Sequence, residues 1–229
     1  MSRPRIGVVL SGCGVYDGAE IHETVITLLA LDRAGAEAVC MAPDVDQLHV
    51  VNHLTGEVAV GERRNVLVES ARIARGKVSD IAAVQPSDLD ALVLPGGFGA
   101  AKNLCDFALS GPQCVVHPDV ARLVRAVHSA GKPVAAMCIA PAILAKLLGE
   151  EAPELTIGSD PATAAALGKL GARHCDCAVG DVVTDDRHKL VTTPAYMLAT
   201  SIAEAAQGIE KLVGELMTLV QEHASVARQ

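Results

Sequence analysis

Residues 132–148, KPVAAMCIAPAILAKLL, place a strand and a helix next to each other with a single cysteine between them. Residues 132–137 form a short, largely apolar run that is typical of a buried strand. A helix is expected over 141–148, because Pro141 suits the first helical position and apolar residues follow it. Cys138 therefore lies on a very tight strand-to-helix turn, the arrangement of a nucleophile elbow with sulfur in place of oxygen.

The same alternation of strand and helix continues on both sides of this turn. It predicts one α/β domain over residues 1–229, with a doubly wound, mostly parallel sheet and helices on both faces, because no linker or repeat interrupts the pattern. The segment around His49 and His53 fits neither pattern. We expect strands at 5–10, 37–42, 90–94 and 155–158, helices at 19–34, 62–75, 118–130 and 161–170, a hairpin at 182–193 and a long final helix from near Met197.

The composition favours a globular protein that binds small molecules or other proteins. Half of the residues are apolar, and with two Phe, two Tyr and no Trp no aromatic platform for stacking bases is expected. The net charge of -8 repels nucleic acids and anionic membranes. Seven scattered cysteines, interpreted as reduced thiols, and the lack of a long apolar segment predict a cytoplasmic protein.

Cys138 is the strongest candidate for a reactive group. The first N–H groups of a helix carry partial positive charge, which stabilises a thiolate and is expected to lower the pKa of this thiol. The alternative is an inert buried cysteine, the usual fate of this residue type in proteins. The elbow context favours the reactive interpretation.

Glu23 is the best candidate partner for Cys138. It lies one turn into the helix expected at 19–34, so its carboxyl group can turn toward the edge of the sheet where Cys138 lies. A carboxylate beside a thiolate raises the pKa of both groups, so the pair is expected to share one proton. Such a glutamate can act as a general acid or base. Alternatively, Glu20 and Glu23 simply complement the helix dipole.

Two glycine-rich loops are expected at the same edge of the sheet. In the loop 95–99, PGGFG, the N–H of Gly97 is predicted to stabilise an oxyanion together with the N–H of Ile139, although a tight turn would also explain the glycines. The loop 12–18, GCGVYDG, loosely resembles a dinucleotide-binding loop but has one residue too many before its last glycine. Nucleotide binding is therefore the weaker interpretation of that loop.

Four metal-capable side chains, HCDC, follow one another at residues 174–177. Cysteines two residues apart on a strand point to one face and supply at most part of a zinc site. His188 or His117 would have to complete it, and an edge or buried strand explains the cluster more simply. No metal and no cofactor are therefore predicted.

Five blocks of sequence resemble the ElbB branch of the ThiJ/PfpI superfamily, whose members are described as isoprenoid-biosynthesis or lycopene-enhancing, glyoxalase-like proteins. The blocks span nearly the whole chain and are specific to this branch, whereas a glycine pair followed by an elbow cysteine indicates only the superfamily. They are SGCGVYDGAEIHE at 11–23, VNHLTGE at 51–57, PGGFGAAKN at 95–103, MCIAP at 137–141 and VTTPAYMLA at 191–199.

This resemblance implies a flavodoxin-like fold of the class I glutamine amidotransferase-like type, and a homodimer. It places Cys138 at the position of the superfamily's nucleophilic cysteine and Glu23 at that of its partner glutamate. Related glyoxalases use neither glutathione nor a metal. Their thiolate adds to an aldehyde of glyoxal or methylglyoxal, and the glutamate moves a proton to give a 2-hydroxy acid. The implied partner is a small reactive aldehyde.

One departure from the superfamily pattern concerns a histidine. Many members carry it directly after the cysteine or after the next strand, where this chain has Ile139 and the sequence IGSD. Asp160, Cys13 and His22 are candidates for an auxiliary role in its place. The leading hypothesis is a slow, cofactor-independent glyoxalase. The alternative is a redox-sensing or regulatory binding protein that uses a low-pKa cysteine with little turnover.

Overall fold

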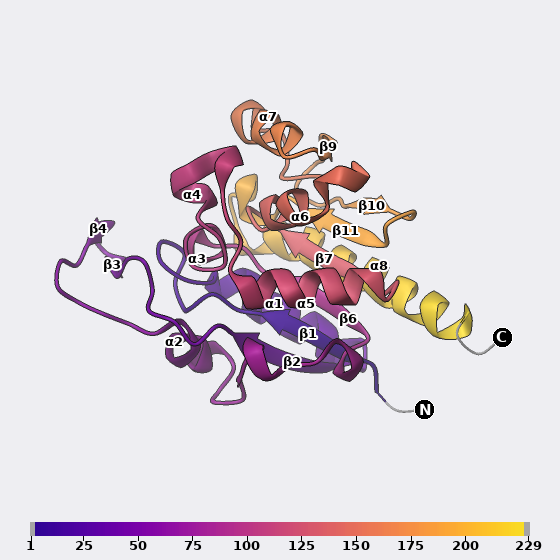
Figure 1. Ribbon diagram of the computed structural model, residues 1–229, viewed down its shortest axis with the longest axis horizontal. Helices are drawn as coiled ribbons and strands as arrows, with labels where there is room; N and C mark the ends of the chain where they lie inside the picture. The colour runs from indigo at the N-terminus through magenta and orange to yellow at the C-terminus, as the bar shows by residue number, and fades with distance from the viewer. Residues whose placement is uncertain (1–2, 227–229) are drawn as a thin grey trace.

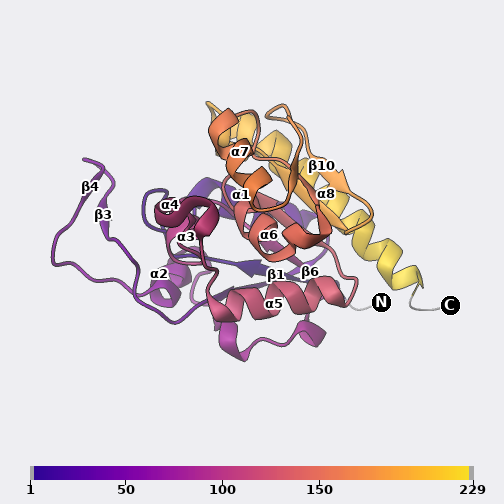
Figure 2. The same ribbon diagram turned by 45° about the horizontal axis from the view of Figure 1, so that its top comes forward.

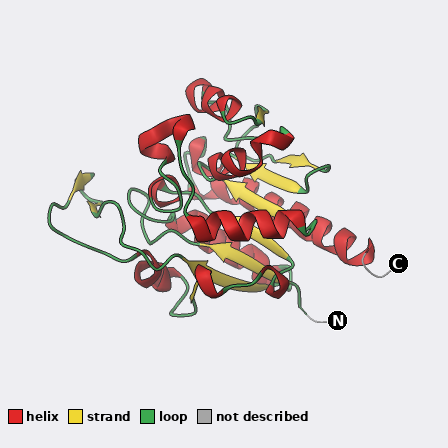
Figure 3. Ribbon diagram, in the orientation of Figure 1, coloured by secondary structure: helices red, strands yellow, loops and turns green. Residues whose placement is uncertain are grey.

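A sheet of seven strands forms the centre of the computed structural model, which describes residues 3–226 (Figures 1 and 3). The strand order is β10-β11-β7-β6-β1-β2-β5, and its neighbours pair in parallel except for β10 and β11. The predicted fold class is thereby confirmed. The strands of this sheet are β1 Arg5–Val9, β2 Glu37–Ala42, β5 Ser79–Asp80, β6 Ala91–Leu94, β7 Val134–Met137, β10 Val183–Asp185 and β11 Leu190–Thr193; two small pairs are β3 Val51–Asn52 with β4 Glu57–Val58, and β8 Glu154–Leu155 with β9 Arg173–His174.

Helices cover both faces of the sheet. Because strand side chains alternate between faces, Val8 packs in the apolar cluster that includes α1, α2 and α8, whereas Val9 packs in the cluster that includes α5, α6 and α7. In Figure 1, α5 crosses in front of the sheet and α8 lies behind it. None of the described helices is long and apolar enough to cross a membrane. The helices are α1 Ile21–Arg33, α2 Val66–Ile73, α3 Phe98–Lys102, α4 Phe107–Ser110, α5 Pro118–Ser129, α6 Pro141–Leu148, α7 Pro161–Lys169 and α8 Ile202–Val226.

The strand order brings three loops to one edge of the sheet. β2 and β6 lie on opposite sides of β1 in the sheet. The order of the strands therefore reverses at β1, and the carboxyl end of β1 is a topological switch point. The loop after β1 contacts the loop after β6: the Glu20 N–H donates to Gly96 O at 3.0 Å, and the Gly99 N–H donates to Gly18 O at 2.8 Å. Cys138 follows β7, the next strand of the sheet, so all three loops meet where ligands of such sheets bind.

Three expected elements differ in their bounds or pairing, and one is the helix expected at 62–75, which is restricted to α2 and capped by Asn65. The final helix begins at Ile202 rather than near Met197, because Ala195–Met197 forms a 3-10 turn in which Ala195 has a φ of 43°. The strand expected at 155–158 is restricted to β8, which pairs with β9 outside the main sheet. Local polar contacts fix the start of the final helix, because the Glu204 N–H donates to Ser201 Oγ and the Thr200 N–H donates to Glu204 Oε2. The pairing of β8 with β9, by contrast, depends on a segment further along the chain.

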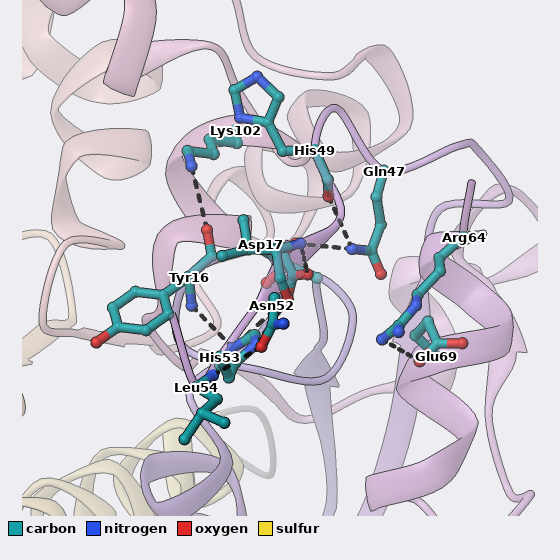
Figure 4. A network of polar contacts seen from close by, with 12 residues as sticks. Tyr16, Asp17, Gln47, His49, Asn52, His53, Leu54, Arg64, Glu69 and Lys102 are labelled. Atoms are coloured by element: carbon teal, nitrogen blue, oxygen red, sulfur yellow. Dashed lines mark hydrogen bonds and ion pairs between the residues drawn. The ribbon is translucent and has the colours of Figure 1, made fainter. Parts of the chain in front are cut away.

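The segment that fits no pattern in the sequence forms an arm, residues 48–62, that extends away from the body as the small β3–β4 hairpin (Figures 1 and 2). Figure 4 shows the polar contacts at its base. The Val51 N–H donates to Asp17 Oδ2 at 2.7 Å, and the Tyr16 N–H donates to His53 Nε2 at 3.2 Å. The arm is thereby attached to the loop after β1, at the same edge as Cys138.

Candidate active site

Cys138 occupies the turn between β7 and α6 in a strained backbone conformation. Its φ of 58° lies in the left-handed region, which residues with a Cβ atom adopt rarely. The sheet holds this geometry, because the Cys138 N–H donates to Thr193 O on the neighbouring strand β11 at 3.1 Å. The side chain is buried, with 8% of the residue exposed. This is the nucleophile-elbow arrangement, with a buried thiol.

Glu23 reaches the same point from the first turn of α1. It is fully buried, and each carboxyl oxygen accepts one backbone N–H: Oε2 from Gly96 at 2.8 Å and Oε1 from Tyr196 at 3.2 Å. The Cys138 thiol lies beside this carboxyl group, because Glu23 Oε2 and Cys138 Sγ both approach the same face of Gly96. The structure therefore brings Glu23 and Cys138 together, from segments that are more than 100 residues apart in the sequence.

The glycine pair of the loop after β6 permits this close approach. A Cβ atom on Gly96 would lie 2.7 Å from Glu23 Oε2 and 2.9 Å from Cys138 Sγ, so only glycine fits between the two side chains. Gly97 has a φ of +90°, which also favours glycine. The N–H groups of Gly97 and Ile139 both act on the Cys138 sulfur and favour its charged form, which lowers the pKa of the thiol. The two N–H groups assigned to an oxyanion site thus lie beside the sulfur.

Burial sets the protonation of the pair. Burial, and next the charge of Glu20, raise the pKa of Glu23 to about 7, although hydrogen bonds from Tyr196, Gly96 and Cys138 oppose the increase. Burial, and next the charge of Glu23, raise the pKa of the Cys138 thiol well above its usual range. The expectation that the helix terminus lowers the pKa of this thiol is therefore wrong, because the nearby N–H groups do not offset desolvation and the neighbouring carboxylate.

The raised pKa of Glu23 predicts a loss of stability as the pH rises. The unfolded chain releases this proton near pH 4.5, whereas the folded chain keeps it until about pH 7. The free energy of unfolding should therefore fall across this window, by up to about 3 kcal/mol from this group. Urea denaturation at several pH values would measure the slope. Glu23→Gln should flatten it and the exposed arm variant Glu57→Gln should not; equal slopes in all three proteins would contradict the prediction.

The auxiliary candidates do not join the pair. Cys13 lies in the loop after β1, where burial and the charge of Glu69 raise its thiol pKa. Asp160 is fully exposed and caps α7, and its Oδ2 accepts the N–H of Thr163 at 2.8 Å. His22 lies closer to the pair, because its Nδ1 is 2.8 Å from the hydroxyl of Tyr196. A local interaction thus occupies Asp160, whereas His22 contacts a residue that binds Glu23.

Sequence reasoning missed the contributions of Gly96, Tyr196 and Glu20 to this site. Gly96 and Tyr196 act through backbone N–H groups, which carry no side-chain signature. Glu20 was considered only as a dipole complement, but its Oε2 accepts the Glu23 N–H at 2.7 Å and caps α1. The glycine pair is the one signal of this part of the site in the sequence, and it indicates a close approach without identifying the partner.

The nucleotide and zinc alternatives gain no support from the geometry. In the loop 12–18, a Cβ atom on Gly14 would overlap the ring of His53, so that glycine allows the arm to pack closely. In the segment 174–177, the His174 ring accepts the N–H of Ile157 at 3.3 Å. Within residues 3–226, no group of three or more His, Cys, Asp or Glu side chains is arranged to hold a metal ion.

Sequence comparison relates most of the chain to known proteins. The profile of the DJ-1/PfpI family matches residues 13–203, which include Glu23 and Cys138. The human glutamine amidotransferase-like class 1 domain-containing protein 3, mitochondrial, is 46% identical over 224 residues, which cover 94% of this chain and 83% of the human protein. The ES1 protein homolog, mitochondrial, of Rattus norvegicus is 45% identical over 226 residues, which cover 95% of this chain and 84% of the rat protein.

A solved structure has the same arrangement of elements. It is the crystal structure of an isoprenoid biosynthesis protein with an amidotransferase-like domain from Ehrlichia chaffeensis, which superposes with a TM-score of 0.88. The two sequences are 38% identical, and the match covers 94% of this chain and 99% of that one. The class I glutamine amidotransferase-like α/β fold is therefore shared over nearly the full length of both chains.

Proposed function

This chain belongs to the DJ-1/PfpI family, and from that premise we propose that it is a cofactor-independent glyoxalase whose nucleophile is Cys138. The observation that carries the proposal is the buried pair of Cys138 and Glu23, with the N–H groups of Gly97 and Ile139 at the sulfur. A nucleophile, a general base and hydrogen-bond donors for an oxyanion are the groups that addition to a carbonyl requires.

The first step is addition of Cys138 to the aldehyde carbon of glyoxal or methylglyoxal. Because the pKa of Glu23 is about 7, its carboxylate is available at neutral pH and above to take the thiol proton as the S–C bond forms. That proton is then delivered to the aldehyde oxygen, whose developing charge the N–H groups of Gly97 and Ile139 stabilise. The product of this step is a hemithioacetal on Cys138.

The second step is an internal oxidation and reduction of the bound substrate. Glu23 removes the hydrogen of the former aldehyde carbon as a proton, and protonation of the adjacent carbonyl oxygen gives an enediol. A proton then returns to the adjacent carbon while the hydroxyl group on the first carbon loses its proton, so the first carbon is oxidised to a thioester and the second is reduced to an alcohol. Water then cleaves the S–C bond, which releases the 2-hydroxy acid and restores the thiol. The overall reaction adds one water and needs no external oxidant, reductant or metal ion.

The finer assignment to the ElbB branch is part of this proposal. It is supported by the five sequence blocks and by the similarity to the Ehrlichia chaffeensis protein, whose name refers to isoprenoid biosynthesis. The curated relatives have mitochondrial names, so a cytoplasmic location is likewise a proposal for this chain, which cell fractionation would test.

A homodimer is proposed as the working form. Its support in the structure is the set of exposed apolar side chains on the arm, where Leu54 and Val60 are 94% and 95% exposed, and on α1, where Ile21, Val25 and Leu29 form one stripe. Large exposed apolar surfaces of this kind are typical of interaction sites. Light scattering of the intact chain would measure the mass in solution, and a monomer at micromolar concentration would contradict this part.

The raised thiol pKa weakens the alternative of a redox-sensing protein. A sensor of that kind depends on a thiolate that is abundant at neutral pH. In this structure burial and the Glu23 carboxylate both keep the proton on Cys138. The direction of this pKa change counts against the low-pKa cysteine that the redox-sensing alternative requires.

Turnover of aldehyde by the wild-type protein tests the proposal directly. Metal-stripped protein is mixed with methylglyoxal or glyoxal without glutathione, and formation of the 2-hydroxy acid is followed by proton NMR. We expect many equivalents of lactate or glycolate per chain. Consumption of no more than one equivalent, with the aldehyde retained on the protein, would overturn the glyoxalase and leave a reactive binding protein.

A further inference from the structure

The turn after β11 presents its backbone to Glu23 in a strained conformation. Ala195 is fully buried and has a φ of 43°, in the left-handed region that disfavours a residue with a Cβ atom. The next N–H along the chain, that of Tyr196, donates to Glu23 Oε1 at 3.2 Å. A strained turn of this kind persists only where surrounding contacts hold it. Backbone hydrogen bonds within the turn, such as Met197 N–H to Pro194 O at 3.0 Å, contribute, and the side chain of Tyr196 adds a contact outside the turn.

The side chain of Tyr196 provides such a contact. Its hydroxyl lies 2.8 Å from Nδ1 of His22, and the two ring centroids are 5.8 Å apart. His22 directly precedes Glu23 on α1. The turn is therefore attached to the first turn of α1 at two adjacent points, with the Tyr196 hydroxyl on His22 and the Tyr196 N–H on Glu23.

We propose that His22 and Tyr196 form a clamp that holds the Tyr196 N–H on Glu23, and that both are positioning residues for the Cys138–Glu23 pair. The role of the clamp in catalysis rests on the proposed function. Its effect on the pKa of Glu23 does not depend on turnover of an aldehyde. Within residues 3–226 neither side chain hydrogen-bonds to the Cys138 sulfur, so neither takes a chemical step.

The clamp has a defined electrostatic consequence for Glu23. The groups that face this carboxyl are the carboxylate of Glu20 on the cap of α1, the thiol of Cys138 after β7, and the N–H groups of Gly96 and Tyr196. The two N–H groups stabilise the charged form and lower the pKa of Glu23, whereas burial and Glu20 raise it. Release of the turn removes one of the two N–H groups and leaves the opposing groups unchanged, so the pKa of Glu23 should rise further.

The test compares the titration of Glu23 in variants that break the clamp. Tyr196→Phe removes only the hydroxyl, and His22→Ala removes its partner, whereas His22→Asn keeps a polar atom near the position of Nδ1. Tyr16→Phe is the matched control, because Tyr16 is the other tyrosine of the chain and its hydroxyl has no hydrogen bond in the described structure. Carbon-13 NMR of glutamate-labelled protein, with Glu23→Gln to assign the signal, reports the pKa of the Glu23 carboxyl without any substrate.

We expect the midpoint of this titration to rise by about one pH unit in Tyr196→Phe and His22→Ala, as loss of one hydrogen bond to a carboxylate predicts. His22→Asn should restore part of the shift, and Tyr16→Phe should show none. The lower limb of the pH profile of kcat/KM should move by the same amount. Thermal unfolding of each variant checks that the fold is intact.

Unchanged Glu23 titration in both Tyr196→Phe and His22→Ala, in folded protein, would overturn the clamp. Equal shifts in Tyr16→Phe would overturn it as well, because the effect would not be specific to the His22–Tyr196 contact. If the titration shifts but the wild type turns over no aldehyde, the clamp stands and the proposed function fails. If the wild type turns over aldehyde and the titration of Glu23 does not shift in the variants, the proposed function stands and the clamp fails.

Discussion

Cys138→Ala lowers kcat/KM for methylglyoxal by roughly 10³-fold or more, to the level of protein-free buffer, if this thiol forms the covalent hemithioacetal. No other described side chain can replace it, because the N–H groups of Gly97 and Ile139 and the carboxyl of Glu23 all converge on this one sulfur. The alanine variant keeps the Cβ atom and the strained backbone, so the fold should be retained. Formation of 2-hydroxy acid, measured by NMR at matched folded content, provides the readout.

Cys175→Ala is the matched control for that experiment. Cys175 is a partly exposed free thiol in the segment after β9, and its sulfur contacts Arg173 O rather than the pair. The Cys175→Ala variant should therefore retain the full rate of methylglyoxal turnover. Wild-type activity in Cys138→Ala, or an equal loss in Cys175→Ala, would show that turnover does not pass through the elbow cysteine.

Glu23→Gln lowers turnover by about 10²–10⁴-fold, the range expected when a general base is lost. The same change should have the opposite effect on alkylation of Cys138 by iodoacetamide at high pH. Because the charge of Glu23 raises the pKa of the Cys138 thiol, its removal makes the thiolate easier to form. A fall in turnover together with a rise in alkylation separates a role in proton transfer from general damage to the site.

The glutamine variant has a structural cost that the design must allow for. Both oxygens of Glu23 accept a backbone N–H, from Gly96 and Tyr196, so the amide nitrogen of glutamine would face one of these donors. Leaving a buried donor unpaired costs about 1–3 kcal/mol, so rates must be compared at matched folded content. Glu57→Gln on the exposed arm serves as the control. Slower alkylation together with slower turnover in Glu23→Gln would contradict the assigned role.

Much of this protein could be predicted from its sequence because the deciding signals are local. The alternation of apolar runs with helical periodicity predicted the parallel sheet and its two helical layers, and the helix 141–148 was predicted with the observed bounds. Only three residues separate the strand at 132–137 from that helix, so the sequence indicated a tight elbow at Cys138. The resemblance pointed to Glu23 as its partner, and the structure places the two side chains in contact. Strand order, by contrast, was not available from any local pattern.

Only the tertiary structure decided the chemical state of the site. The donors to Glu23 come from Gly96 and Tyr196, 73 and 173 residues further along the chain, and strand order alone brings them together. The direction of the pKa change at Cys138 depends on burial, which outweighs the helix terminus that the sequence suggested. By itself the sequence determined which elements form and where the sulfur lies, because backbone preferences and apolar periodicity act over a few residues. Desolvation and long-range contacts depend on the packed fold, and they determine the donors to Glu23 and the direction of the pKa change at Cys138.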